Sequence, residues 1–200
     1  MRLHHQPRSR STRALWLLEE LGVPFDLTVM SRADKQTPEY RALHPLGRAP
    51  VLEEEGGPVF ESAALVLHIA DQHLDAGLIA PLGTHDRALQ YQWCFFAMTD
   101  IEGALMDIAR QAWKDSGEPY ADIVASATER FVGTAGVIEA AVGGGEYLVG
   151  NVFSVADLVV GSVLGFARTA ELTELPAGVV AYVDRLEARP ARQRAVAVTL

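Results

Sequence analysis

The stretch HPLGRAPVLEEEGGPVFESAALVLHI, from His44 to Ile69, decides the predicted fold of the first half of the chain. Two short β-like segments, Pro50–Glu53 and Pro58–Glu61, are joined across a turn that contains two glycines, and this pattern predicts a β-hairpin. Ser62 is a typical helix N-cap, and apolar residues at helical spacing follow it, so we expect a helix from Ala63 to about Leu74. The stretch therefore predicts the order strand, strand, helix.

The residues upstream show the same mixture of short β-like and helical patterns. The expected elements are a strand over residues 2–5, a helix that begins at Ser11 or Thr12 and ends at Gly22, a strand over residues 25–29 and a helix that begins at Thr37-Pro38. The first part of the chain is thus predicted to have the order βαβαββα.

The second half of the chain contains long helical patterns and no convincing strand. The expected helices cover residues 85–114, 120–142, 155–168 and 177–187, and Ser154 with Asp157 forms a capping box before the third of them. We therefore expect an α+β protein with two domains, one over residues 1–76 and an all-helical one over residues 85–200, joined by a linker over residues 77–84.

Composition and charge exclude several classes of protein. A net charge of −9 over 200 residues argues against a nucleic-acid binder, which needs an excess of basic residues. The single cysteine, Cys94, excludes an internal disulfide, and its aromatic neighbours favour a packed thiol. No apolar run is long enough to span a membrane, and the first ten residues do not resemble a signal peptide. We expect a cytoplasmic protein.

Two further patterns carry no predicted chemistry. His68 and His73 are five residues apart and lie on different faces of a helix, so no metal site is predicted. The basic run of Arg185, Arg189, Arg192 and Arg194 near the end of the chain is interpreted as a solvated face.

The start of the first predicted helix is a candidate anion site. Ser9 and Ser11 supply hydroxyls, Arg10 lies between them, and the free N–H groups and dipole of a helix N-terminus favour a negative charge. A hydroxyl at that point could hold a thiolate by hydrogen bonding. The alternative interpretation is that one serine is simply the N-cap of the helix.

Two more candidate sites lie in the stretch quoted first. Glu61 and Ser62 stand between a strand and a helix, where an N–H, a hydroxyl and a carboxylate match the zwitterionic end of an amino acid. The alternative is that Ser62 is an ordinary helix cap with an adjacent acid. Ala49 precedes Pro50 at a strand entrance. If that bond is cis, the Ala49 backbone could face a ligand, with Arg48 as a nearby cation; an ordinary trans junction is the alternative.

Four stretches together resemble glutathione S-transferases. They are RSRSTRALWLLEELGVPF (Arg8–Phe25), HPLGRAPVL (His44–Leu52), ESAALVLHI (Glu61–Ile69) and YLVGNVFSVADLVVGSVL (Tyr147–Leu164). The resemblance covers nearly the whole chain. It implies a thioredoxin-like N-terminal domain that binds glutathione, followed by an all-α helical bundle domain that supplies most of the pocket for the electrophile.

The resemblance also implies roles for the candidate residues. Ser62 and Glu61 would hold the γ-glutamyl end of glutathione, Ala49 before a cis Pro50 would pair with the cysteinyl backbone, and Arg48 would lie near the glycine carboxylate. The thiolate-stabilising group would be Ser9 or Ser11. We favour Ser9, with Arg10 as a helper, because Ser11 lies nearer the N-cap and its oxygen should turn toward the N–H groups of its own helix.

The predicted function is that of a glutathione transferase with roles in detoxification. Glutathione is the co-substrate, with no other cofactor, and a small hydrophobic electrophile is the second substrate. The resemblance further implies a homodimer. Two alternatives are open: a non-catalytic glutathione-binding or scaffold protein of the same fold, and a glutathione-dependent peroxidase or reductase.

Overall fold

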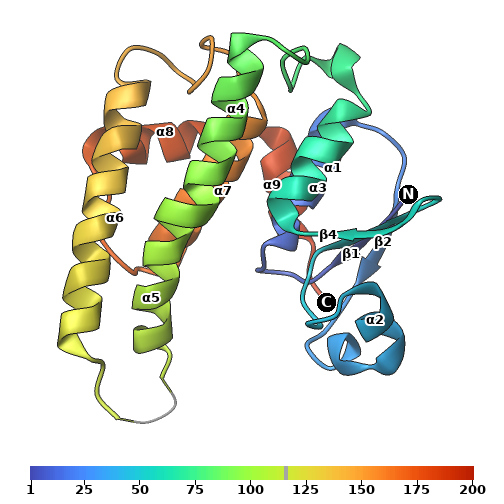
Figure 1. Cartoon of the computed structure of the whole chain (residues 1–200), viewed down its shortest axis with the longest axis horizontal. Helices are drawn as coiled ribbons and strands as arrows, with labels where there is room; N and C mark the ends of the chain where they lie inside the picture. The colour runs from blue at the N-terminus through green and yellow to red at the C-terminus, as the bar shows by residue number, and fades with distance from the viewer. Residues whose placement is uncertain (115–116) are drawn as a thin grey trace. The chain divides into compact units, whose positions relative to one another are not determined.

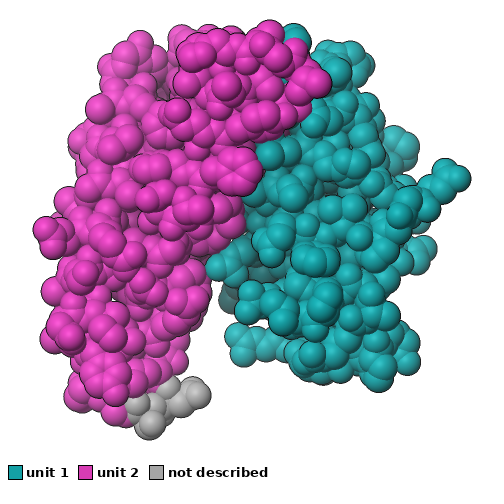
Figure 2. Space-filling view, in the orientation of Figure 1, with its two compact units in different colours: residues 1–81, 188–200 teal, residues 82–187 magenta. Residues whose placement is uncertain are grey.

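The computed structural model describes residues 1–114 and 117–200, which form two compact units (Figure 2). Unit 1 comprises Met1–Pro81 together with Ala188–Leu200, and unit 2 comprises Leu82–Glu187. Unit 1 contains the sheet, whereas the secondary structure described in unit 2 is helical. The predicted fold class, a thioredoxin-like domain followed by a helical one, is confirmed.

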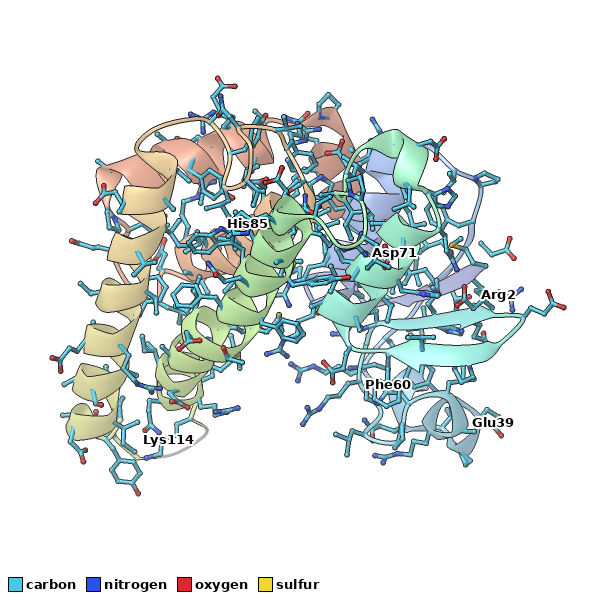
Figure 3. The ribbon with its side chains drawn as sticks, turned by 45° about the horizontal axis from the view of Figure 1, so that its top comes forward. Arg2, Glu39, Phe60, Asp71, His85 and Lys114 are labelled. Carbon is cyan, nitrogen blue, oxygen red and sulfur yellow. The ribbon has the colours of Figure 1, made fainter. Side chains whose placement is uncertain are left out.

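Unit 1 is built on a four-stranded mixed sheet with the order β2-β1-β3-β4. The strands are β1 (Arg2–His5), β2 (Asp26–Val29), β3 (Val51–Glu54) and β4 (Gly57–Phe60). β1 is parallel to β2 and antiparallel to β3, and β3 is antiparallel to β4. His4 pairs with Val51, which in turn pairs with Phe60, labelled in Figure 3. The end of β1, the start of β3 and the end of β4 therefore share one edge of the sheet.

Helices cover both faces of this sheet. α1 (Ser11–Leu21) and α3 (Ser62–Asp71) pack against each other on one face, and α2 (Pro38–Leu43) lies on the other (Figure 1). Single 3₁₀ turns at Asp34–Gln36 and Leu74–Ala76 complete the unit. The predicted order βαβαββα is thus observed.

The predicted helix boundaries in unit 1 have clear local causes. α1 ends at Gly22, which adopts a left-handed conformation (φ 64°) that glycine reaches without strain, and its N–H bonds the carbonyl of Leu18. At the start of α2 the Thr37 hydroxyl accepts a hydrogen bond from the N–H of Tyr40. α1 is buried continuously from Ala14 to Leu18, which anchors it on the sheet.

Unit 2 is a bundle whose helices agree with the predicted stretches, with one interruption. They are α4 (His85–Phe96), α5 (Glu102–Ala112), α6 (Ala121–Val142), α7 (Val155–Thr169) and α8 (Ala177–Glu187). The stretch predicted as one helix over 85–114 contains a π-helical segment, Ala97–Ile101, between α4 and α5. The sequence analysis considered only α-helical spacing and so did not indicate this turn, since π-helical turns are rare and occur as single-turn insertions within α-helices.

The predicted capping box at the start of α7 is present, and its carboxylate makes further contacts beyond the cap. The Asp157 carboxylate accepts hydrogen bonds from the N–H of Ser154 at 3.0 Å and of Leu148 at 2.9 Å. It also accepts one from the hydroxyl of Tyr182 on α8 at 2.9 Å. Burial raises the pKa of Asp157. The carboxylate thus joins the preceding loop, α7 and α8 at one buried point.

The end of the chain differs from the prediction, which assigned it to the helical domain as a solvated basic face. Residues 190–197 form an additional helix, α9 (Pro190–Ala197), which packs against α1 in unit 1. Arg189 binds both carboxylate oxygens of Glu20, at 2.6 and 2.9 Å, and Arg194 pairs with Glu19 at 2.5 Å. Arg189 and Arg194 are therefore attachment points of the chain end on α1, whereas Arg185 lies on α8 and donates to the carbonyl of Glu146.

Candidate functional site

The loop between β1 and α1 presents the two predicted serines in different environments. Ser9 is half-buried, and its hydroxyl donates to the carbonyl of Gln6 at 2.7 Å and accepts from the N–H of Ser11 at 3.2 Å. Ser11 is fully buried at the first position of α1. The two hydroxyl oxygens lie 2.8 Å apart. Ser9 is thus the serine that has access to the surface.

The expectation that Ser11 would turn toward the N–H groups of its own helix is wrong. Its oxygen accepts from the N–H of Gln6 at 3.0 Å and lies 2.8 Å from Nδ1 of His5. The N-cap position of α1 is held by Arg10, and the N–H of Ser11 donates to Oγ of Ser9. The contact of Ser11 with His5 follows from burial, because the Ser11 hydroxyl faces inward and lies against the end of β1, not along the first turn of α1.

His5 is a functional candidate that the sequence analysis did not single out. It is 1% exposed at the end of β1, and burial lowers its pKa to about 4. Its imidazole is therefore neutral at physiological pH. The two adjacent histidines in the sequence gave no sign of this, since the contact with Ser11 depends on how α1 is placed over β1.

The start of α3 forms a second anion site, with a contact that differs from the prediction. Ser62 does not cap α3 with its side chain; its buried hydroxyl accepts a hydrogen bond from the guanidinium of Arg13 at 3.0 Å. Arg13 is 3% exposed and comes from the first turn of α1. A buried cation therefore lies beside the N-terminus of α3, where the helix dipole also favours an anion.

Glu61 has a strained backbone that shapes the same site. Its φ is 76°, in a region that non-glycine residues rarely adopt. Such conformations cost about 1–3 kcal/mol and cluster at functional sites. The turn allows the chain to pass from β4 into α3 within one residue, while the Glu61 side chain remains exposed.

The Ala49–Pro50 bond is cis, which decides between the two alternatives left open by the sequence. The β1–β3 pairing ends at Val51, so the Ala49 backbone lies beyond the sheet ladder. Residues 44–50, between α2 and β3, form the cis-proline loop. Tyr40 supports this loop, because its hydroxyl donates to the carbonyl of Arg48 at 2.7 Å. The ring of His44 packs on Phe60 with centroids 4.7 Å apart, which ties the loop to the end of β4.

Strand register brings the candidate residues together. The serine loop follows β1, Ala49 and Pro50 precede β3, and Glu61 and Ser62 follow β4, all at the same edge of the sheet. The bond between Arg13 and Ser62 confirms that the first turns of α1 and α3 are close. Arg10 and Arg48 are exposed in the adjacent loops. The arrangement offers two anion-binding helix ends and a free backbone segment between them.

The other features considered in the sequence analysis are not part of this group of residues. Cys94 is buried in α4 and its sulfur lies 3.8 Å from the carbonyl of Val155. Within residues 1–114 and 117–200, no group of three or more His, Cys, Asp or Glu side chains could hold a metal ion. No helix in the same residues is both long and apolar enough to cross a membrane.

Comparison with known proteins agrees with the fold. The family described as glutathione S-transferase, N-terminal domain, matches residues 8–72. Glutathione S-transferase-like protein gedE of Aspergillus terreus is 31% identical over 161 residues, which cover 73% of this chain and 69% of that protein.

For two other relatives the match covers a smaller share of the relative's own length. Glutathione S-transferase 3 of Schizosaccharomyces pombe is 43% identical over 72 residues, which are 36% of this chain and 30% of that protein. Elongation factor 1-gamma of Prunus avium is 29% identical over 168 residues, 83% of this chain and 38% of that protein. The chain thus spans only about a third of the length of these two proteins.

Solved structures share the fold over nearly the full chain. A glutathione transferase from Methylococcus capsulatus superimposes with a TM-score of 0.84 at 25% identity, over 98% of this chain and 96% of that one. A sphingomonad glutathione S-transferase complexed with glutathione gives a TM-score of 0.82 at 24% identity, over 98% and 97% of the two chains.

Proposed function

The chain belongs to the glutathione S-transferase family, and we propose that it is a glutathione transferase in which Ser9 holds bound glutathione as its thiolate. The observation that carries the proposal is the shared sheet edge. There, a half-buried hydroxyl at the start of α1 lies near the cationic start of α3. Glutathione has a thiol at its centre and carboxylates at its ends, so it needs donors at both places.

The γ-glutamyl end is proposed to bind at the start of α3. Its α-carboxylate takes the N–H and hydroxyl of Ser62, next to the buried guanidinium of Arg13, and its ammonium group meets the carboxylate of Glu61. The first N–H groups of a helix have no partner within the helix, so they are available to this carboxylate.

The rest of glutathione is proposed to lie along the cis-proline loop. The backbone N–H and C=O of Ala49, beyond the end of the β1–β3 ladder, pair with the cysteinyl residue as an added strand would. The exposed guanidinium of Arg48 then attracts the glycine carboxylate. This path directs the thiol toward the start of α1.

Burial favours Ser9 over Ser11 as the group that touches sulfur. Ser11 is 0% exposed, so its hydroxyl cannot reach a bound ligand, whereas Ser9 is half-buried on the outer side of the same pair. The Ser9 hydroxyl needs only to rotate from the carbonyl of Gln6 to donate to a thiolate. Arg10, the residue before the first turn of α1, adds positive charge to this end of the helix.

The chemistry that follows is nucleophilic transfer. A free thiol of this type has a pKa of about 8.5, so only a few per cent is ionised at neutral pH. A hydroxyl donor and a helix N-terminus lower that pKa and raise the fraction of thiolate. The sulfur lone pair forms a bond to an electrophilic carbon of a small hydrophobic substrate, and the leaving group departs with its electron pair.

A homodimer is proposed for the assembly, on the strength of the family. Phe95 on α4 is 64% exposed and Leu46 in the cis-proline loop is 61% exposed, so both side chains are available to a partner subunit. Light scattering at micromolar concentration should give twice the mass of the chain. A monomer mass would contradict the dimer without affecting the proposed reaction.

One alternative has a specific observation in its favour. A relative that matches 83% of this chain is named for translation elongation and not for transfer. A non-catalytic protein of this fold would bind glutathione as the neutral thiol and give no conjugate. A glutathione-dependent peroxidase would instead consume peroxide, which a coupled turnover assay detects.

The proposal is tested by the Ser9→Ala variant in steady-state conjugation assays with a small aryl halide. Loss of a hydrogen bond to a charged group is worth about 1.5–3 kcal/mol, so kcat should fall about 10- to 150-fold while the Kd for glutathione stays nearly unchanged. Ser31→Ala, which removes an exposed loop hydroxyl bonded to Asp34, is the matched control. Wild-type kcat in Ser9→Ala would overturn the assignment.

A further inference from the structure

A line of three polar side chains runs from the buried end of β1 to the surface of the serine loop. Nδ1 of His5 lies 2.8 Å from Oγ of Ser11, and that oxygen lies 2.8 Å from Oγ of Ser9. His5 is 1% exposed and Ser11 is 0% exposed, whereas Ser9 is half-buried. Only the last member of the line can touch a ligand.

We propose that His5 and Ser11 are positioning residues that donate in series to Ser9 and so strengthen its hydrogen bond to the glutathione sulfur. The proposal rests on the function proposed above for Ser9. In this arrangement Nδ1–H of His5 donates to Ser11, the Ser11 hydroxyl donates to Ser9, and the Ser9 hydroxyl donates to the sulfur.

Counting protons and lone pairs shows why this direction fits. The Ser11 oxygen has two lone pairs and one proton. The N–H of Gln6 takes one lone pair at 3.0 Å, and Nδ1–H of His5 takes the other. The Ser11 proton has two acceptors within reach, the carbonyl of Gln6 at 3.0 Å and Oγ of Ser9 at 2.8 Å, and because the Gln6 carbonyl already accepts the Ser9 hydroxyl at 2.7 Å we assign it to Ser9. The other lone pair of Ser9 accepts the N–H of Ser11 at 3.2 Å. With both its lone pairs filled, Ser9 can act toward a ligand only as a donor.

The opposite direction leaves Ser9 in a weaker position. If Nδ1 of His5 carried no proton, the Ser11 hydroxyl would donate to it, and Ser11 would then accept the proton of Ser9. In that direction Ser11 no longer donates to Ser9, so the bond from Ser9 to the sulfur is not strengthened from the buried side. That direction would also leave a buried N–H on Nε2 of His5, an atom that has no hydrogen-bond partner within residues 1–114 and 117–200.

Burial supports the arrangement by keeping His5 uncharged. The pKa of His5 is lowered to about 4, so the ring carries one proton throughout the pH range in which glutathione is ionised. Hydrogen bonds in series polarise one another by about 10–30% each, so a donor at the far end strengthens the bond at the sulfur.

The tautomer of His5 is the direct test, and it needs no variant. In ¹⁵N-labelled wild-type protein, long-range ¹H–¹⁵N spectra at pH 7 distinguish a protonated Nδ1 from a protonated Nε2. We expect His5 to carry its proton on Nδ1. A proton on Nε2 would overturn the proposal, whatever the protein catalyses.

Variants test the consequence for the bound thiol, which is followed by the ultraviolet absorbance of the thiolate. His5→Leu should raise the pKa of bound glutathione by about half a unit with its Kd unchanged, a smaller rise than in Ser9→Ala. His5→Asn should restore the wild-type pKa, because its amide N–H lies at the same distance from Cα as Nδ1. Adding Ser11→Ala to His5→Leu should shift the pKa no further than Ser11→Ala alone.

Three outcomes separate this inference from the proposed function. If Ser9→Ala shifts the thiol pKa and His5→Leu does not, Ser9 acts without the relay and the inference fails. If His5→Asn behaves as His5→Leu, the role of His5 is packing, and the inference also fails. If neither Ser9→Ala nor His5→Leu shifts the thiol pKa, the proposed function of Ser9 fails as well. Thermal melts of each variant confirm that it is folded; Ser11→Ala replaces His5→Leu if the latter is not.

Discussion

Replacement of Ser62 by alanine is expected to weaken glutathione binding strongly while it leaves α3 in place. The hydroxyl is buried, accepts from Arg13 at 3.0 Å and is proposed to donate to the α-carboxylate of glutathione. A hydrogen bond to a charged group contributes about 1.5–3 kcal/mol. The Kd should therefore rise about 10- to 150-fold, since each 1.4 kcal/mol is a factor of ten.

The same substitution has a cost in stability that must be measured beside the affinity. Ser62 does not cap α3, so the loss does not come from the helix end; it comes from Arg13, which loses one of its buried hydrogen bonds. We expect a loss of about 1–3 kcal/mol in the free energy of unfolding. Urea titration of the variant measures this loss of stability. The binding assay is then carried out at a temperature at which the variant is folded.

Isothermal titration calorimetry with glutathione is the assay, and Thr84→Ala is the matched control. Thr84 caps α4 in unit 2, where its hydroxyl accepts from the N–H of Arg87 at 3.3 Å. Its loss should cost about 1 kcal/mol of stability and leave the Kd for glutathione unchanged. A folded Ser62→Ala protein that binds glutathione with wild-type affinity would refute the reasoning and remove Ser62 from the site.

Three further predictions concern stability. His5 has a pKa of about 4 when folded and an ordinary value of about 6.5 when unfolded, so its contribution is complete above pH 6.5 and is lost as the pH falls toward 4. Urea titrations should show a loss of about 3 kcal/mol over that range, which His5→Asn should reduce. Gly161→Ala should cost about 1–3 kcal/mol in thermal melts, because the added methyl group overlaps a buried leucine of α8. Gly103→Ala, with open space at that position, should cost nothing; equal effects would contradict the packing argument. Arg189→Gln, which breaks the two hydrogen bonds to the Glu20 carboxylate, should make residues 188–200 more sensitive to limited proteolysis. Unchanged cleavage would show that the attachment of α9 does not depend on this ion pair.

Local patterns in the sequence predicted the elements of the fold well. The turn at Gly22, the cap at Thr37 and the capping box at Ser154 each depend on residues within four positions of one another, so the chain reveals them directly. The paired β-like segments around the two glycines likewise predicted the hairpin of β3 and β4.

The contacts that were missed join residues far apart in the chain. Arg13 and Ser62 are 49 positions apart, and Arg189 and Glu20 are 169 apart, so no local pattern could indicate either pair. A serine at the start of a helix is interpreted as a cap unless the position of the arginine that donates to its hydroxyl is known. The basic run near the end of the chain is interpreted as solvated unless the acidic partners on α1 are known.

Candidate site residues divide along the same line. Glu61, Ser62 and the Ala49–Pro50 junction follow from where strands begin and end, together with the family resemblance. The choice between Ser9 and Ser11 required their burial, and His5 required the placement of α1 over β1. Residues that act through other residues are the ones that a sequence pattern leaves out.

The pKa of the glutathione thiol in its complex with the wild-type protein tests the central claim most directly. Ultraviolet absorbance of the thiolate, followed from pH 5 to pH 9 with the protein in excess, gives that pKa. The proposed role of Ser9 at the start of α1 predicts a value clearly below the free value of about 8.5, and a return toward 8.5 in Ser9→Ala. Glutathione that binds the wild-type protein and titrates at its free value would contradict it.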